Sequence, residues 1–208
     1  MIMMFGTPYW LRLLGGRGLT WEMPPDGYSI YLTFDDGPCP STTPIILDIL
    51  KQFGVKATFF CVGTNVEKHP EMYNKILKEG HMTANHGHRH LKGWKTDPAA
   101  YVGNVEQCSR VVDSRLFRPP YGKMTPAQRR ALKDKYHIIM WSVLSRDYDR
   151  RVSPQRCLEQ SLKRSHPGSI IVFHDNEKSM ANVEYVLPKY VDAMKGRGFE
   201  FRVLDFGH

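Results

Sequence analysis

The chain has 208 residues, of which 41% are hydrophobic and 24% charged, a composition typical of a globular domain with one sizeable core. Its formal net charge is +8 at pH 7, but lysine and arginine are scattered rather than gathered in a stripe or a recognisable nucleic-acid-binding module. Composition and charge therefore argue against a nucleic-acid-binding protein and favour an ordinary basic surface over attraction to anionic polymers or membranes.

The cysteines and the first residues bear on the compartment. Cys39, Cys61, Cys108 and Cys157 show no Cys-x-x-Cys spacing, and Cys61 lies in an apolar run, so we expect no disulfide framework. Residues 1–14 lack the pattern of a signal peptide, and no segment reaches the ~20 apolar residues of a membrane span. We expect a monomer that is cytoplasmic or peripheral to the inner membrane, or extracytoplasmic if a leader has been removed.

Strand-like and helix-like segments alternate along the chain. Residues 1–28, rich in aromatics, glycine and proline, are expected to form an arm that packs on one domain over residues 29–208. The predicted strands are 30–34, 57–62, 82–85, 116–118, 137–143, 169–173 and 200–205. Helices are predicted from an N-cap at Thr43, over 70–79, after Asp97, Thr125 and Ser153, and over 182–195. This alternation predicts an α/β fold with a parallel sheet, open or closed, whose functional residues lie where strands end.

The first polar cluster, Asp35-Asp36-Gly37-Pro38, directly follows an apolar strand. Neighbouring residues of a strand point to opposite faces, so two adjacent carboxylates share a site only at a strand end, where the pleat breaks. Such a pair can supply one metal ligand and one base. The alternative is an acidic turn without chemistry.

Three histidines, His86, His88 and His90, follow the predicted strand over 82–85. On one helical turn, His86 and His90 would face the same way and bind one metal, whereas His88 would point elsewhere. Together with Asp36 they give two imidazoles and one carboxylate, a set that leaves positions open for water and substrate. A solvated polar loop, or histidines bonded to backbone groups, is the alternative.

Three further clusters follow later strands. In Arg118-Pro119-Pro120-Tyr121-Gly122, the arginine can clamp a carboxylate through two hydrogen bonds, and the Tyr121 amide can face developing negative charge. His174 ends an apolar run and suits general acid or base chemistry, although a lone histidine there is more often a hydrogen-bonded core residue. Residues 145–149 follow another strand. Five polar clusters at strand ends predict a metal-dependent hydrolase.

These clusters resemble, in order, the motifs of the polysaccharide deacetylases, the carbohydrate esterases of family four with a NodB homology domain. The matching segments are 33–38, the His86/His90 pair, 118–122, 147–148 and 172–175, within residues 29–205. The resemblance implies an α/β fold, a distorted (β/α) barrel of about seven parallel strands with surrounding helices. By the same resemblance the catalytic base is Asp35, the metal ligands are Asp36, His86 and His90, and the catalytic acid is His174. It further implies that Arg118 orients the base and that Asp147 holds His174.

The implied reaction is removal of an N-acetyl group from an amino-sugar glycan, with the Tyr121 amide facing the oxyanion. One divalent ion is expected, zinc first, with iron, cobalt or nickel as alternatives. The rival functions are an O-acetyl esterase or small-amide hydrolase with the same site, and a non-catalytic carbohydrate-binding relative. Three positions depart from the family pattern: Gly87 replaces Ser or Thr, Leu144 an aspartate and Tyr148 a tryptophan. We expect them to alter the sugar groove and leave the reaction unchanged.

Overall fold

The computed structural model describes residue 5 and residues 18–206. The strands are β1 (Leu19–Thr20), β2 (Ser29–Asp35), β3 (Thr58–Cys61), β4 (Met82–Asn85), β5 (Leu116–Phe117), β6 (His137–Ile139), β7 (Val143–Leu144), β8 (Ile170–His174) and β9 (Glu200–Phe201). The helices are α2 (Thr43–Phe53), α3 (Gly63–Lys68), α4 (Pro70–Lys78), α5 (Pro98–Cys108), α6 (Pro126–Leu132), α7 (Pro154–Arg164) and α8 (Met180–Gly196), with 3₁₀ turns η1 (Gly93–Lys95) and η2 (Pro120–Gly122).

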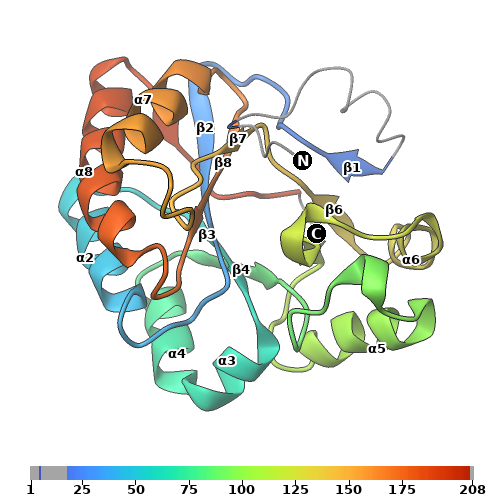
Figure 1. Cartoon of the computed structure of the whole chain (residues 1–208). Helices are drawn as coiled ribbons and strands as arrows, with labels where there is room; N and C mark the ends of the chain where they lie inside the picture. The colour runs from blue at the N-terminus through green and yellow to red at the C-terminus, as the bar shows by residue number, and fades with distance from the viewer. Residues whose placement is uncertain (1–4, 6–17, 207–208) are drawn as a thin grey trace.

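The strands form one sheet in the order β1-β6-β5-β4-β3-β2-β8-β7, and β9 pairs beside the start of β2. All of these named strand pairs are parallel. The sheet curls into an open half-barrel of eight strands, with α2, α4, α7 and α8 on one side and α5 and α6 on the other (Figure 1). The α/β fold expected from the sequence, a distorted barrel of parallel strands, is confirmed.

The single strand predicted over residues 137–143 is wrong, because this segment forms two short strands, β6 and β7, near opposite ends of the sheet. Its first part, β6, pairs with β1 and β5, whereas the residues after it join β7, which pairs with β8. In between, the Met140 N–H donates to the Thr20 carbonyl (2.7 Å) and the Ser142 N–H to the Ile170 carbonyl (3.1 Å). The interruption therefore carries the chain across the opening of the half-barrel.

Helix starts follow the chemistry of their capping residues. The side chains of Asp97, Thr125 and Ser153 accept hydrogen bonds from the first-turn N–H groups of α5, α6 and α7. At α2 the N-cap is Thr42 rather than Thr43, and neither supplies a side-chain cap there. The reason is that both hydroxyls donate instead to a buried carboxylate, that of Asp175.

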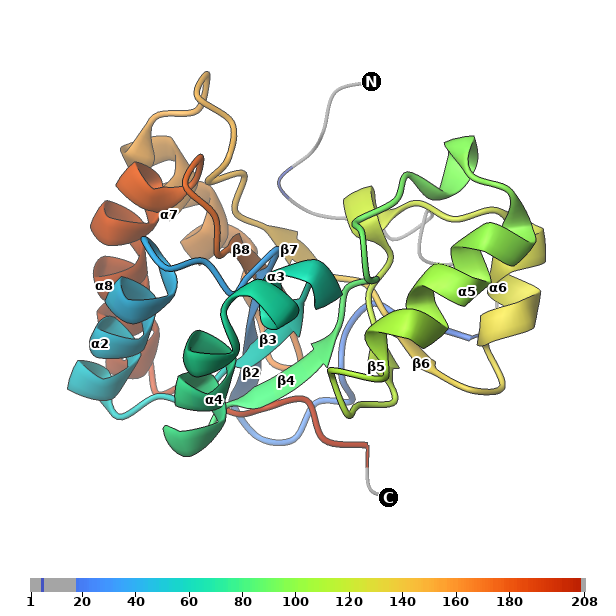
Figure 2. The same ribbon diagram turned by 90° about the horizontal axis from the view of Figure 1, so that it is seen from below.

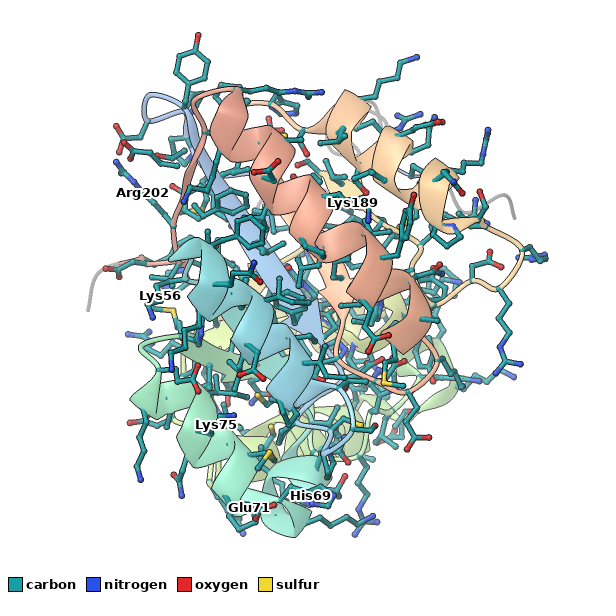
Figure 3. The ribbon with its side chains drawn as sticks, turned by 90° about the vertical axis from the view of Figure 1, so that its left-hand side faces the viewer. Lys56, His69, Glu71, Lys75, Lys189 and Arg202 are labelled. Carbon is teal, nitrogen blue, oxygen red and sulfur yellow. The ribbon has the colours of Figure 1, made fainter. Side chains whose placement is uncertain are left out.

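Alternation along β2 assigns its residues to two cores. Ile30, Leu32 and Phe34 belong to the large core between the sheet and the helices, whereas Tyr31 belongs to the core inside the curl. Figure 3 looks at the helical side and shows α2 and α8 lying side by side over β2. By the same alternation Asp35, at the end of β2, faces the inside of the curl.

The cysteines are free, as the sequence predicts. Cys61, Cys108 and Cys157 are buried, and burial raises the pKa of each thiol, to about 12 at Cys108. Three of the four sulfurs are therefore protonated and shielded from solvent.

Most of the expected N-terminal arm lies outside the described residues. Phe5 is buried, and its carbonyl accepts a hydrogen bond from the Leu144 N–H (2.9 Å). From residue 18 onward the described chain adds β1 to the sheet beside β6. No helix within the described ranges is long and apolar enough to span a membrane.

The core predicts the cost of a single truncation. Leu47, on α2, is fully buried, so Leu47→Ala should lower the free energy of unfolding by about 2–5 kcal/mol. Leu77, on α4, is 43% exposed, and Leu77→Ala should cost less than about 0.5 kcal/mol. Urea unfolding of both variants measures the difference, and equal costs would contradict the assigned core.

Candidate active site

The two adjacent carboxylates lie at the carboxyl end of β2. Asp35 is 4% exposed and faces the inside of the curl. Asp36 has a left-handed backbone (φ 81°), which breaks the pleat and directs its side chain to the same site. Its carbonyl accepts a hydrogen bond from the Asn65 side chain (2.8 Å), which fixes this turn.

Arg118 forms a buried ion pair with Asp35. The guanidinium is fully buried, and its Nη1 donates to Asp35 Oδ1 (2.6 Å) and to the Thr33 hydroxyl (2.8 Å). Nη2 instead donates to the Met140 carbonyl (3.0 Å), and the guanidinium carbon lies 4.0 Å from the Phe60 ring centroid. The expected clamp through two hydrogen bonds is therefore wrong: one nitrogen holds the carboxylate and the other holds the backbone.

Asp36, His86 and His90 form a cluster suited to a metal ion. Asp36 Oδ1 lies 3.5 Å from His86 Nε2 and 3.0 Å from His90 Nε2. One ligand atom from each of the three residues lies within 4.8 Å of the other two. Within the part of the chain that the structure describes, this is the one such group of three.

The protonation of the cluster fits a metal. His86 Nδ1 lies 2.9 Å from the Arg118 carbonyl, which can only accept, so Nδ1 donates to it and Nε2 is the ring atom that faces Asp36. Burial would raise the pKa of Asp36, but hydrogen bonds with His86 and His90 and the charge of His174 hold it well below its ordinary value. The third residue is therefore a carboxylate, and the set matches the two imidazoles and one carboxylate of an open divalent site.

His86 and His90 lie close together, but the predicted helical turn between them is wrong. His86 directly follows β4, and residues 86–90 form a loop in which His90 has φ 51°. Two hydrogen bonds tie this loop to Asn104 on α5, from the His88 N–H to its carbonyl (3.1 Å) and from the Arg89 N–H to its side chain (2.9 Å). His88 points away, with Nε2 3.6 Å from a Glu67 carboxylate oxygen, as the sequence predicts.

His174 and Asp147 are paired, as the sequence predicts. His174 Nδ1 lies 2.7 Å from Asp147 Oδ1, and the His174 backbone N–H donates to Asp147 Oδ2 (2.7 Å). Burial would lower the pKa of His174, but the Asp147 carboxylate, together with the charges of Asp36 and Asp35, outweighs it and raises the value to about 9. The imidazole is therefore protonated near neutral pH. The Tyr148 ring packs edge-on against it, with centroids 4.7 Å apart.

Tyr121 forms the rim of the cluster. It has φ 61° within η2, its side chain is 51% exposed, and its ring centroid lies 4.7 Å from that of His90. The loop after β5 therefore reaches the candidate ligand His90, and the role expected for the Tyr121 amide stays a prediction.

Comparison with known proteins identifies the group to which this site belongs. Residues 22–137 match the family model described as polysaccharide deacetylase. The chain belongs to the polysaccharide deacetylase family. It is 30% identical to a peptidoglycan-N-acetylglucosamine deacetylase of Bacillus cereus, over 88% of this chain and 89% of the relative. It is 34% identical to a chitooligosaccharide deacetylase of Bradyrhizobium sp. (strain ANU 289), over 85% and 89%.

A solved structure agrees with this assignment. The crystal structure of a peptidoglycan N-acetylglucosamine deacetylase in complex with 4-naphthalen-1-yl-N-oxidanyl-benzamide superposes with a TM-score of 0.84. The identity is 31%, covering 93% of this chain and 94% of the other. The family resemblance read from the motifs and the barrel that it implied are confirmed. The present chain is therefore a deacetylase, a hydrolase that acts on carbon–nitrogen bonds.

Two residues to which the sequence assigned no role, Asn176 and Asp175, also contact the site or its surrounding loops. Asn176 Nδ2 donates to Asp36 Oδ2 (2.6 Å), which leaves Oδ1 turned toward the histidines. Asp175 is buried and accepts hydrogen bonds from both Thr42 and Thr43 at the start of α2. Burial raises the pKa of Asp175 to about 7, against the effect of the two hydroxyls. Their position directly after His174 was the signal available in the sequence.

A hollow of about 570 Å³ lies at the opposite ends of the strands, lined by Asp26, Tyr31, Lys56, Gly80, Arg202, Val203 and Asp205. Lys56 and Arg202, labelled in Figure 3, lie along one edge of the molecule. Lys56 donates to the Glu79 carbonyl and Arg202 to Asp26, so both cations serve local contacts. The groups suited to chemistry are at the carboxyl ends of the strands.

The His174–Asp147 pair predicts a titration. In metal-free protein the raised pKa means that His174 contributes stability that is full below pH 6.5 and is lost as pH rises through about 9. Asp147→Asn keeps the shape but removes the charge, so the pKa of His174 should fall back toward 6.5. NMR titration of the His174 ring measures this. Metal affinity is the control and should not change, and an unchanged midpoint would contradict the pairing.

Proposed function

We propose that this deacetylase removes N-acetyl groups from N-acetylglucosamine residues of a glycan of peptidoglycan or chitooligosaccharide type. The observation that carries the proposal is the placement of Asp35 and His174, which are paired residues on the neighbouring parallel strands β2 and β8. Paired residues point to the same face, so a candidate base and a candidate acid lie side by side, with Asp35 Oδ2 4.0 Å from His86 Nε2 of the cluster and the charge of His174 acting on Asp36. The relatives named above act on the same class of glycan, which supports the substrate.

Asp36, His86 and His90 would hold one divalent ion. Their two imidazoles and carboxylate suit zinc, our first choice, and also iron, cobalt and nickel. When bound, such an ion polarises the acetyl carbonyl and lowers the pKa of a coordinated water. Hydrogen bonds orient two of these side chains: His86 Nδ1 donates to the Arg118 carbonyl, and the Asn176 side-chain amide donates to Asp36.

Asp35 acts as the base that takes a proton from the attacking water. Arg118 Nη1 holds its Oδ1, which leaves Oδ2 directed toward the cluster, 4.0 Å from His86 Nε2. Water attacks the acetyl carbon as Asp35 accepts the proton, and the Tyr121 amide donates to the oxygen that becomes negative.

His174 supplies the proton for the departing amine. The amine of an amino sugar is too basic to leave without one, and His174 is protonated near neutral pH because Asp147 faces its Nδ1. Nε2 therefore remains to donate to the leaving nitrogen. This requirement favours an amide substrate over an O-acetyl ester, whose alcohol leaves with less assistance.

If His90 is a metal ligand, its replacement should remove both the bound metal and the activity. His90→Ala should reduce bound metal from about one ion per chain to a small fraction and abolish acetate release from N-acetylglucosamine oligomers. Elemental analysis and an acetate assay on the same zinc-loaded sample measure both. His88→Ala is the matched control, since His88 faces Glu67, and should keep the metal. Full metal occupancy in His90→Ala would remove His90 from the ligand set.

The proposed role of Asp35 as the base predicts a variant that loses turnover but keeps its metal. Asp35→Asn is nearly isosteric but accepts no proton, so turnover should fall by roughly 100-fold or more while the metal stays bound. The same two measurements apply. Loss of metal together with activity would show that Asp35 is a ligand, and that the division of labour between the two aspartates is reversed.

A further inference from the structure

Trp94 is a large apolar side chain held at the surface. It is 72% exposed, more than the other large hydrophobic residues that the structure describes. In the described ranges no aromatic ring or cation stacks on its indole. A single exposed hydrophobic side chain is common on protein surfaces, so the meaning of Trp94 depends on how it is held and on what lies beside it.

The turn that carries Trp94 is built rigidly. The indole Nε1 donates to the Met124 carbonyl (3.1 Å). Gln128, fully buried in α6, donates through Nε2 to the carbonyls of Gly93 (2.9 Å) and Thr96 (3.1 Å), on either side of Trp94. A Cβ at Gly93 would lie 2.5 Å from the Lys123 carbonyl, so the two loops touch directly. The indole is therefore oriented before any ligand arrives, which lowers the entropy cost of binding.

This turn is continuous with the candidate active site. Trp94 follows His90 by four residues, which span at most about 14 Å of chain. Between them Lys92 Nζ lies 5.4 Å from the Tyr121 ring centroid, and that ring packs on His90. In Figure 2 the chain leaving β4 and the chain leaving β5 run up the same side of the molecule. Lys92 and Tyr121 therefore connect the turn of Trp94 with His90 of the candidate metal-ligand cluster.

We infer that Trp94 is the stacking platform for a second sugar ring of the glycan, one that is not itself deacetylated. The flat, apolar C–H face of a pyranose ring packs on an indole, while its hydroxyls remain in water or donate to neighbouring polar groups. The inference rests on the proposed function, because it takes the glycan as the substrate. It makes the enzyme selective for oligomers long enough to reach Trp94 from the site.

The test compares N-acetylglucosamine oligomers of increasing length on the zinc-loaded enzyme. Trp94→Ala should lower kcat/KM for the tetramer by about 10-fold and leave the shortest deacetylated oligomer within about 2-fold. Trp94→Phe keeps an aromatic face but loses the hydrogen bond to Met124, and should retain most of the activity on the tetramer. Tyr28→Ala is the matched control, because Tyr28 is 62% exposed at the opposite end of β2, and should change nothing.

A binding measurement separates this inference from the proposed function. In metal-free protein, addition of the tetramer should change the tryptophan emission, and most of that change should be lost in Trp94→Phe, which keeps Trp141 beside Gly122. If the zinc-loaded wild type releases no acetate from any oligomer but the emission responds in the wild type and is largely lost in Trp94→Phe, the proposed function fails and the inference about Trp94 stands. If the wild type is active and Trp94→Ala loses activity equally at every length, or none, the platform is overturned. Equal losses in Trp94→Phe and Trp94→Ala would also overturn it, by assigning the effect to the Met124 hydrogen bond.

Discussion

The buried guanidinium of Arg118 is the group on which both the site and the curvature of the sheet depend. It follows β5, yet it holds Asp35 on β2, which two intervening strands separate from β5 in the sheet. Its other nitrogen binds the Met140 carbonyl, where the chain crosses the opening of the half-barrel, and its own carbonyl orients His86. One residue therefore links the candidate base Asp35, the candidate metal ligand His86 and the segment that crosses the opening of the half-barrel. Removing one partner of such a buried pair typically costs about 3–5 kcal/mol.

The site also depends on backbone conformations that side chains rarely adopt. Within the described ranges, four residues other than glycine have positive φ: Asp36, His90, Tyr121 and Arg146. Three of them belong to the site and the fourth directly precedes Asp147. Such conformations cost of order 1–3 kcal/mol each and persist only where the surroundings enforce them. Here the surroundings are the sheet and the hydrogen bonds that Asn65, Asn104 and Asn176 make with the site loops, so the stability of the fold maintains the strain that orients the candidate ligands.

The sequence predicted those parts of the site that follow from sheet geometry. Parallel strands end on one edge, so polar residues after apolar runs, such as Asp35, His86 and His174, had to converge. The contacts that the sequence did not predict are tertiary. The loop that joins His86 to His90 depends on Asn104 from a later helix, so a local helical pattern gave the wrong conformation. The contact between Asn176 and Asp36 joins residues 140 positions apart, and no periodic pattern in the sequence indicates such a contact.

The strand order has a consequence for how the chain folds during its synthesis. β2 lies between β3, its neighbour in sequence, and β8, whose residues follow more than a hundred positions later. One edge of β2 therefore stays open until residues 170–174 have left the ribosome, exposing unpaired N–H and C=O groups beside an apolar core. Because some pairs that build the site, such as Asp35 with His174, are distant in sequence, high contact order makes their assembly slow. The nascent protein is thus most prone to aggregation just before its chemistry becomes possible.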